Sequence, residues 1–215
     1  MTLPLGAFIT VWTILALNIV SPGPNVLNTI TTAMGSGRPA GMASAAAVGI
    51  GIGVWCLAMS LGMAAVFAVV PYSQETLTVM ASGLLVWFAA KYLRAGYRGA
   101  SGREASIRGV AGLGLGASFL RSLAVNATNP KALTTWIAIL GIFPVAEART
   151  GDVALLTAGA CALSLSIHAV YAVLFSTRPA AAVYLRAAPV INLAVGVFFL
   201  GFAVKLTAPL LSRAL

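Results

Sequence analysis

The sequence predicts an all-α, polytopic membrane protein with six transmembrane helices, and three observations lead to this fold class. Of the 215 residues, 60% are hydrophobic and only 8% are charged, whereas a soluble domain carries about 25% charged residues. Four stretches contain no Asp, Glu, Lys or Arg: 1–37, 39–74, 153–177 and 187–204. Each is long enough to cross a bilayer, for which a helix needs roughly 17–25 apolar residues. This composition excludes soluble enzymes, DNA-binding modules and disordered chains.

The expected spans have lengths suited to membrane helices, which satisfy their own backbone hydrogen bonds in lipid. They cover roughly residues 5–33, 42–70, 75–96, 115–143, 153–176 and 188–210. The first apolar segment lacks a basic n-region and a small-residue cleavage site, so we expect it to be retained as a span. We expect a single transmembrane domain, 1–215, with halves of about 1–98 and about 110–215 joined by a basic loop.

The short loops predict the orientation, because basic loops face the cytoplasm. The end of the third span and the loop that follows it carry the basic residues Lys91, Arg94, Arg98, Arg103 and Arg108. Both termini are then periplasmic, although Lys205 and Arg213 fall on the outer side against this rule. The same loops account for the net charge of +9, so the expected partner is the lipid bilayer and not nucleic acid.

Two of the spans are interrupted by proline, which removes a backbone donor and clashes with the preceding turn. The first span contains Pro22, Gly23 and Pro24 within SPGPN. In the fourth span, Asn129 and Pro130 predict a helix restart, with Asn as the N-cap and Pro at the first helical position. At about 1.5 Å per residue, both interruptions lie near the middle of the ~30 Å hydrocarbon core.

These interruptions fall in the first helix of each three-helix half, and three spans per half give the halves inverted orientations. This is the layout of an inverted-repeat transporter, whose substrate site lies where the broken helices meet. The alternative is a pair of proline kinks that only shape packing. Because the interruptions match in position and are flanked by Asn25, Asn126 and Asn129, the sequence favours a site.

The residues around the interruptions suit a zwitterion. Backbone amides from Gly23 to Asn25 and the ammonium of Lys131 are expected to bind a carboxylate, and snorkelling to the inner surface is the alternative for Lys131. Backbone carbonyls between Asn18 and Ser21 are expected to accept an ammonium. The full set of expected substrate-binding residues is Asn18, Ser21, Pro22, Gly23, Pro24, Asn25, Thr29, Asn126, Asn129, Pro130 and Lys131.

A few further side chains have two interpretations each. His168 and Tyr171 are three residues apart and share one face of the fifth span, either as a relay for protons or substrate or as packing residues. Cys56 and Cys161 are either small buried residues or the redox pair of a membrane thiol-disulfide carrier. With one His in the chain, we expect no metal and no cofactor. No Ser, His and acid constellation lies within the spans, so we do not expect an enzyme.

A family resemblance is carried by the segments SPGPN, LNTITTAMGSGRPAGMASAAAVGIGIG and FLRSLAVNATNPKA. They are similar to the LysE/RhtB-type family of amino-acid exporters, and the part from Asn28 to Gly41 resembles homoserine/threonine and other neutral amino-acid exporters. The resemblance implies export from the bacterial cytoplasm across the inner membrane, driven by the proton gradient. It leaves open whether the chain forms a homo-oligomer.

The sequence departs from many of these relatives in its acidic residues. Many have an acid where this chain has Val54, and some have one near the position of Ser164. All four acids here lie in or beside loops, which leaves His168 and Lys131 as the candidates for proton transfer. A cationic substrate would add an unpaired charge near Lys131, so we expect export of neutral amino acids such as homoserine, threonine or a small aliphatic one.

Overall fold

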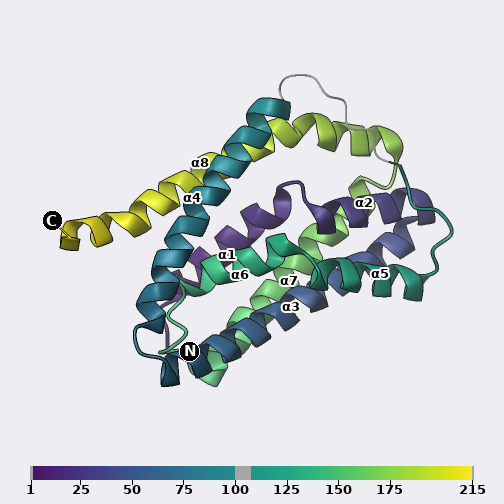
Figure 1. Cartoon of the computed structure of the whole chain (residues 1–215). Helices are drawn as coiled ribbons and strands as arrows, with labels where there is room; N and C mark the ends of the chain where they lie inside the picture. Colours follow the sequence, from purple (N-terminus) through teal and green to yellow (C-terminus); the bar gives the residue numbers. More distant parts are fainter. Residues whose placement is uncertain (1, 100–107, 215) are drawn as a thin grey trace.

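The computed structural model describes residues 2–99 and 108–214, with side chains as far as 204, and this part consists of α-helices without a strand (Figure 1). The helices are α1 (Leu5–Val20), α2 (Pro24–Ser36), α3 (Arg38–Val69), α4 (Ser73–Gly99), α5 (Leu115–Ala127), α6 (Pro130–Leu140), α7 (Thr150–Leu174) and α8 (Arg178–Ala214). The expected all-α class is therefore confirmed. Arg103 of the basic loop and the side chains of Lys205 and Arg213 lie outside the described part.

The count of membrane spans is confirmed only in part. In the described ranges, α3, α4, α7 and α8 are each long and apolar enough to cross a bilayer, and α1 with α2 forms a fifth candidate bent by 53°. The pair α5 and α6 covers the range expected for the fourth span, but these helices have only 13 and 11 residues and carry Arg121 and Lys131. The arrangement of six spans in two inverted halves therefore stays a prediction.

Two helix boundaries differ from the sequence-based expectation. α3 begins at Arg38, directly after Gly37, whose φ of 87° allows the sharp turn from α2. α8 begins at Arg178 instead of near 188, so residues 178–187, which the expected spans left as a loop, are helical. The segment PAAAVYLRAA is rich in alanine, the strongest helix former, and therefore extends the helix.

The helices pack in pairs around a shared interior. α4 packs along α8 and α3 along α7, while α1 and α6 lie between these pairs (Figure 1). α2 and α5 pack against α3 at the end of the molecule away from the N-terminus (Figure 1). The main core fills the half around α1, α4 and α6 with fully buried apolar side chains, the largest being Trp136, Phe8, Phe88 and Phe199. The two broken helices thus meet at the border of this apolar half.

The start of the chain is fixed to α7 through a buried carboxylate. Asp152 is 1% exposed and accepts hydrogen bonds from the backbone amides of Thr2 at 2.8 Å and Arg149 at 3.1 Å. The hydroxyl of Thr2 also donates to it. These bonds satisfy the carboxylate and hold the N-terminal end of α1 beside that of α7.

Candidate functional site

The first interruption separates α1 from α2 by the three residues 21–23, of which Ser21 and Gly23 have extended backbone. Ser21 has φ −69° and ψ 141°, and Gly23 has φ −170° and ψ 175°. Pro22 and Pro24 have no amide hydrogen to continue the helix, so the chain leaves α1 and restarts at a bend. A C-terminal helix end, buried at Ser21, and an N-terminal helix end, half-buried at Gly23 and Asn25, therefore lie next to each other.

The carbonyl end of α1 is capped by side chains from three other helices. Lys131 Nζ donates to the carbonyl oxygens of Asn18 at 2.7 Å and Ser21 at 3.0 Å, and to Ser21 Oγ at 2.7 Å. The hydroxyls of Tyr171 and Tyr184 both donate to the carbonyl of Val20, at 3.1 Å and 3.2 Å. A cation at a helix C-terminus is favoured by the helix dipole. Lys131 thus occupies the carbonyls that the sequence predicted for a substrate ammonium.

The amide end of α2 is open by contrast. Its N-cap, Gly23, has no side chain to offer, and the first helical bond runs from the amide of Leu27 to the carbonyl of Gly23. The preceding amides of Asn25 and Val26 have no partner in the described part of the chain. The side-chain Oδ1 of Asn25 is also buried without a hydrogen bond. Free amides at a helix N-terminus form an anion-binding site.

The second interruption is capped by one of its own residues, Asn129. Asn129 Oδ1 accepts the amide of Lys131 at 3.0 Å, and the carbonyl of Asn129 accepts the amide of Ala132 at 3.0 Å. Pro130 lies in the first turn of α6, where its missing amide costs nothing. The predicted helix restart is therefore confirmed, and its cap leaves no free amide for a ligand.

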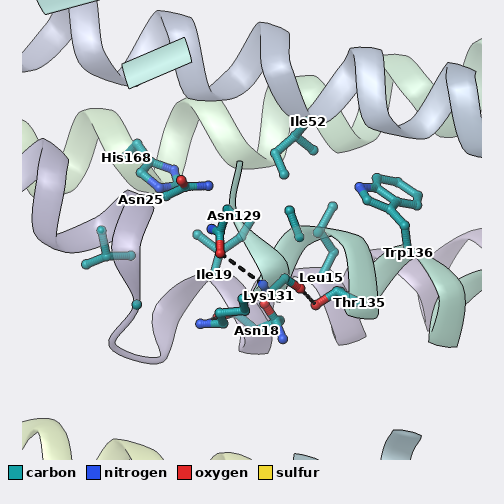
Figure 2. Close-up of a pocket in the computed structure, with 13 residues that line it drawn as sticks. Leu15, Asn18, Ile19, Asn25, Ile52, Asn129, Lys131, Thr135, Trp136 and His168 are labelled. Atoms are coloured by element: carbon teal, nitrogen blue, oxygen red, sulfur yellow. Dashed lines mark hydrogen bonds between the residues drawn. The ribbon is translucent and has the colours of Figure 1, made fainter. Parts of the chain in front are cut away.

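A small pocket lies between the two interruptions (Figure 2). Its cavity volume is about 30 Å³, enough for about two water molecules, since one needs about 10–15 Å³ of such a volume. The expected residues that line it are Asn18, Gly23, Asn25, Asn129, Lys131 and His168, and the other lining residues are Leu15, Ile19, Val26, Ile52, Ala132, Thr135 and Trp136. The two interruptions thus share one pocket, which is too small in this conformation for an amino acid.

His168 faces this pocket with one ring nitrogen free. Its Nδ1 lies 2.8 Å from the carbonyl of Ser164, while Nε2 is buried without a partner. In Figure 2 the ring lies on the same wall of the pocket as Asn25. Tyr171 stands edge-on to His168, with ring centroids 6.3 Å apart, but its hydroxyl points to α1 and not into the pocket. His168 and Tyr171 are therefore neighbours, but His168 bonds to the carbonyl of Ser164 and Tyr171 to that of Val20.

Other expected residues lie outside the pocket. Thr29 bonds to Ser44 at 3.0 Å. Asn126 packs against Gly51, and its backbone carbonyl accepts Trp55 Nε1 at 3.3 Å. The remaining members of the set shape the interruption or cap it without lining the pocket: Ser21, Pro22, Pro24 and Pro130.

Two aromatic residues at the site were not expected from the sequence. The hydroxyl of Tyr92 receives hydrogen bonds from Ser21 Oγ at 3.0 Å and Asn18 Nδ2 at 3.3 Å, and Lys131 Nζ lies 5.6 Å from its ring centroid. Trp136 borders the pocket, and its buried Nε1 has no partner. Both residues lie in ordinary apolar helix patterns, so only the fold reveals their position.

The two cysteines are not joined by a disulfide. Both are free, and they lie on the facing helices α3 and α7. Cys56 accepts a hydrogen bond from Thr157, with 3.4 Å between Sγ and Oγ1, while Cys161 packs against Gly53. The thiol-carrier alternative therefore has no support. No metal-binding group of His, Cys, Asp or Glu occurs among the residues that the structure describes.

Taken together, apolar helices long enough to span a bilayer, two interrupted helices and a pocket between them that is lined by asparagine, lysine and histidine among apolar residues define a multi-pass membrane protein of the transporter class. A comparison with protein families matches residues 16–209 to the LysE type translocator family. The chain belongs to this family, whose members export amino acids and other small molecules and are not enzymes. No curated protein and no solved structure matches it.

Proposed function

We propose that this protein exports small neutral amino acids from the bacterial cytoplasm across the inner membrane, with the proton gradient as the driving force. The observation that carries the proposal is the pair of opposed helix ends around the pocket. The amide end of α2 is free, and the carbonyl end of α1 holds a cation. A zwitterion has a negative carboxylate for the amide end of α2 and a positive ammonium for the carbonyl end of α1.

The arrangement supports a sequence of contacts during binding. In the empty protein, Lys131 occupies the carbonyls of Asn18 and Ser21. A substrate ammonium competes for the same oxygens, while its carboxylate binds the free amides of Asn25 and Val26. Once displaced from these carbonyls, the ammonium of Lys131 can pair with that carboxylate, because it lies beside Gly23 at the amide end of α2. In this order of contacts, the carbonyls of α1 bind the substrate ammonium and Lys131 pairs with the substrate carboxylate, as expected from the sequence.

The charges around the pocket favour a neutral substrate over a basic one. None of the described carboxylates lines the pocket, so a second positive charge beside Lys131 would stay unpaired. The structure also sharpens the comparison with acid-containing relatives. Val54 is 59% exposed and points away from the pocket, whereas Ser164 is fully buried beside His168. Ser164 is therefore the position at which an acid could affect the choice of substrate.

Proton coupling is proposed for His168 and Lys131. Both line the pocket, and His168 Nε2 is buried without a partner. A proton taken up by either group changes the charge that a zwitterion meets. The orientation proposed with this mechanism has the basic end around Arg38 and Arg121 in the cytoplasm and both termini in the periplasm.

The test is efflux from cells that express the protein after loading with a panel of labelled amino acids. We expect homoserine, threonine or small aliphatic amino acids to leave faster than from cells without the protein, and lysine and arginine to be retained. A protonophore should abolish the difference. Export of lysine as fast as any neutral amino acid would contradict the proposed site chemistry.

A further inference from the structure

A second polar region lies away from the pocket, on the face of α5 that packs against α3. Ser118, Ser122 and Asn126 follow each other at intervals of four residues, and each is at most 1% exposed. Four-residue spacing places them on one face of the helix. This stripe begins next to Asn129 of the pocket and runs to the start of α5, at the end of the molecule away from the N-terminus (Figure 1).

The helices opposite this stripe present polar side chains as well. Asn28 of α2 donates to Ser122 Oγ at 2.7 Å, and Ser44 of α3 accepts from Ser122 Oγ at 2.7 Å. Thr29 bonds to Ser44 at 3.0 Å. All four side chains are buried. We call this region between α2, α3 and α5 the inner seam, and define it by Asn28, Thr29, Thr32, Ser44, Ser118, Ser122 and Asn126.

Several groups of the inner seam are buried without a hydrogen-bond partner among the residues that the structure describes. They are Thr32 Oγ1, Ser118 Oγ and both side-chain polar atoms of Asn126. An unpaired buried polar group costs about 1–3 kcal/mol, so a seam used only for packing would be more stable with alanine or valine here. These groups gain partners when water or a polar ligand enters between the helices.

The opposite side of the pocket is built differently. From Trp136 outward, the core around α1, α4 and α6 consists of apolar side chains such as Phe8 and Leu85, both 0% exposed. A zwitterion loses its hydration without compensation among such groups. The inner seam is therefore the side on which a polar solute can be solvated along its way.

The far end of the inner seam reaches the basic surface. Arg121 is exposed there, and its Nε donates to Asn28 Oδ1 at 3.0 Å. The seam itself contains hydroxyl and amide groups only. Such a lining solvates a carboxylate and an ammonium together but offers no partner for a net positive charge, and Arg121 at the mouth repels one.

We propose that the inner seam is the inner passage of the transporter, along which Asn28, Ser44 and Ser122 contact a small neutral zwitterion between Arg121 and the pocket. The proposal rests on the proposed function and adds its route and the residues that select the solute. The passage opens when α5 separates from α2 and α3, while α3 and α7 stay together.

The first test ties α5 to α3. In a background with Cys56→Ala and Cys161→Ala, the pair Ser44→Cys and Ser122→Cys replaces two hydroxyls 2.7 Å apart, so that a small side-chain movement brings the two sulfurs to the disulfide distance of about 2.05 Å. Oxidation should stop efflux of labelled threonine, and dithiothreitol should restore it. The matched control is Thr157→Cys with native Cys56 in a Cys161→Ala background, whose paired atoms are 3.4 Å apart between α3 and α7. Oxidation of this control should leave efflux unchanged.

The second test needs neither transport nor a disulfide. In the cysteine-free background, Ser118→Cys and Ser122→Cys should react with a membrane-impermeant thiol reagent added to the basic side in inside-out vesicles. We expect labelling about tenfold faster than for the control Leu85→Cys, because thiol reactivity follows exposure to water.

The outcomes separate the passage from the proposed function. Efflux that survives a formed Ser44–Ser122 cross-link, or seam thiols as unreactive as the Leu85→Cys control, would overturn the passage. If no amino acid of the panel is exported but the seam thiols are labelled, the passage stands and the proposed substrate fails. If threonine is exported and the seam thiols stay unlabelled, the proposed function stands and the passage is elsewhere.

Discussion

The two interrupted helices look alike in sequence and differ in what they offer to a ligand. At the first interruption, α2 starts with free amides, and the carbonyls that end α1 are held by Lys131, Tyr171 and Tyr184. At the second, Asn129 caps α6 with its own side chain. The first interruption is thus stabilised by side chains of other helices, which a ligand can replace. The second interruption is capped by its own side chain.

This difference assigns the two interruptions separate tasks. The capped start of α6 fixes the position of Lys131, which reaches across and supplies the cation for the end of α1. In the proposed mechanism, the open start of α2 supplies the anion site. The pocket therefore depends on an asymmetry between two elements that an inverted repeat would make equivalent. The local cause is the N-cap residue, which is Gly23 in one case and Asn129 in the other.

The largest effect is expected from removing the bridge between the interruptions. Lys131→Met keeps the apolar stem but leaves the carbonyls of Asn18 and Ser21 without a cation. Because hydrogen bonds to charged groups contribute about 1.5–3 kcal/mol each, we expect efflux to fall by roughly a hundredfold or more. Lys91→Met is the control, since Lys91 is an exposed lysine over Trp87. Efflux by the Lys131→Met variant at the unmodified rate would remove Lys131 from the mechanism.

A cap added at the first interruption should make it resemble the second. Gly23→Asn supplies a side-chain oxygen to the amides of α2, which then cannot bind a carboxylate. Exchanging Gly for Asn at an N-cap changes stability by only a few tenths of a kcal/mol. We therefore expect efflux to fall by about tenfold or more with the melting temperature in detergent nearly unchanged.

Gly23→Ala separates the cap from the added bulk. A Cβ at this position would lie 3.0 Å from Lys131 Nζ, so both variants press on the lysine, but alanine leaves the amides free. Efflux should be clearly higher for Gly23→Ala than for Gly23→Asn. Equal losses in the two variants would show that the amides of α2 do not bind the substrate.

The reverse change opens the second interruption. Asn129→Ala frees the amide of Lys131, and loss of an N-cap side chain costs about 1 kcal/mol of stability. We expect a lower melting temperature and efflux reduced by about two- to fivefold, because Lys131 is less firmly positioned. A larger loss of efflux than in Gly23→Asn would reverse the ranking of the two interruptions.

The smallest effect is expected from the tyrosines at the end of α1. Tyr171→Phe or Tyr184→Phe removes one of two donors to the carbonyl of Val20. The remaining hydroxyl keeps that carbonyl paired, so each single variant should change efflux by less than about twofold. The double variant leaves the carbonyl unpaired and should reduce efflux more than the product of the single effects, which a double-mutant cycle measures.

Local sequence patterns determined much of this protein. Long charge-free runs require membrane helices, since backbone groups in lipid must pair internally, and the prolines of SPGPN and NPK required the two interruptions. The cap of α6 also follows from Asn129 and Pro130 alone, because a cap uses atoms a few residues apart. The start of α8 shows the limit of this reasoning. The charged residues Arg178 and Arg186 suggested a loop there, but the helix propensity of the alanines extends the helix.

Only the tertiary structure decided which groups remain free. The sequence placed Lys131 near a substrate carboxylate, but the fold brings its ammonium to the carbonyls of Asn18 and Ser21, 113 and 110 residues away. It also brings Tyr92 beside Ser21 and turns Val54 to the outside. Such pairings depend on how distant helices pack and rotate about their axes, which no local pattern encodes. The start of α2 keeps free amides and the start of α6 does not, and this difference arises from these long-range contacts as well as from the residue at each N-cap.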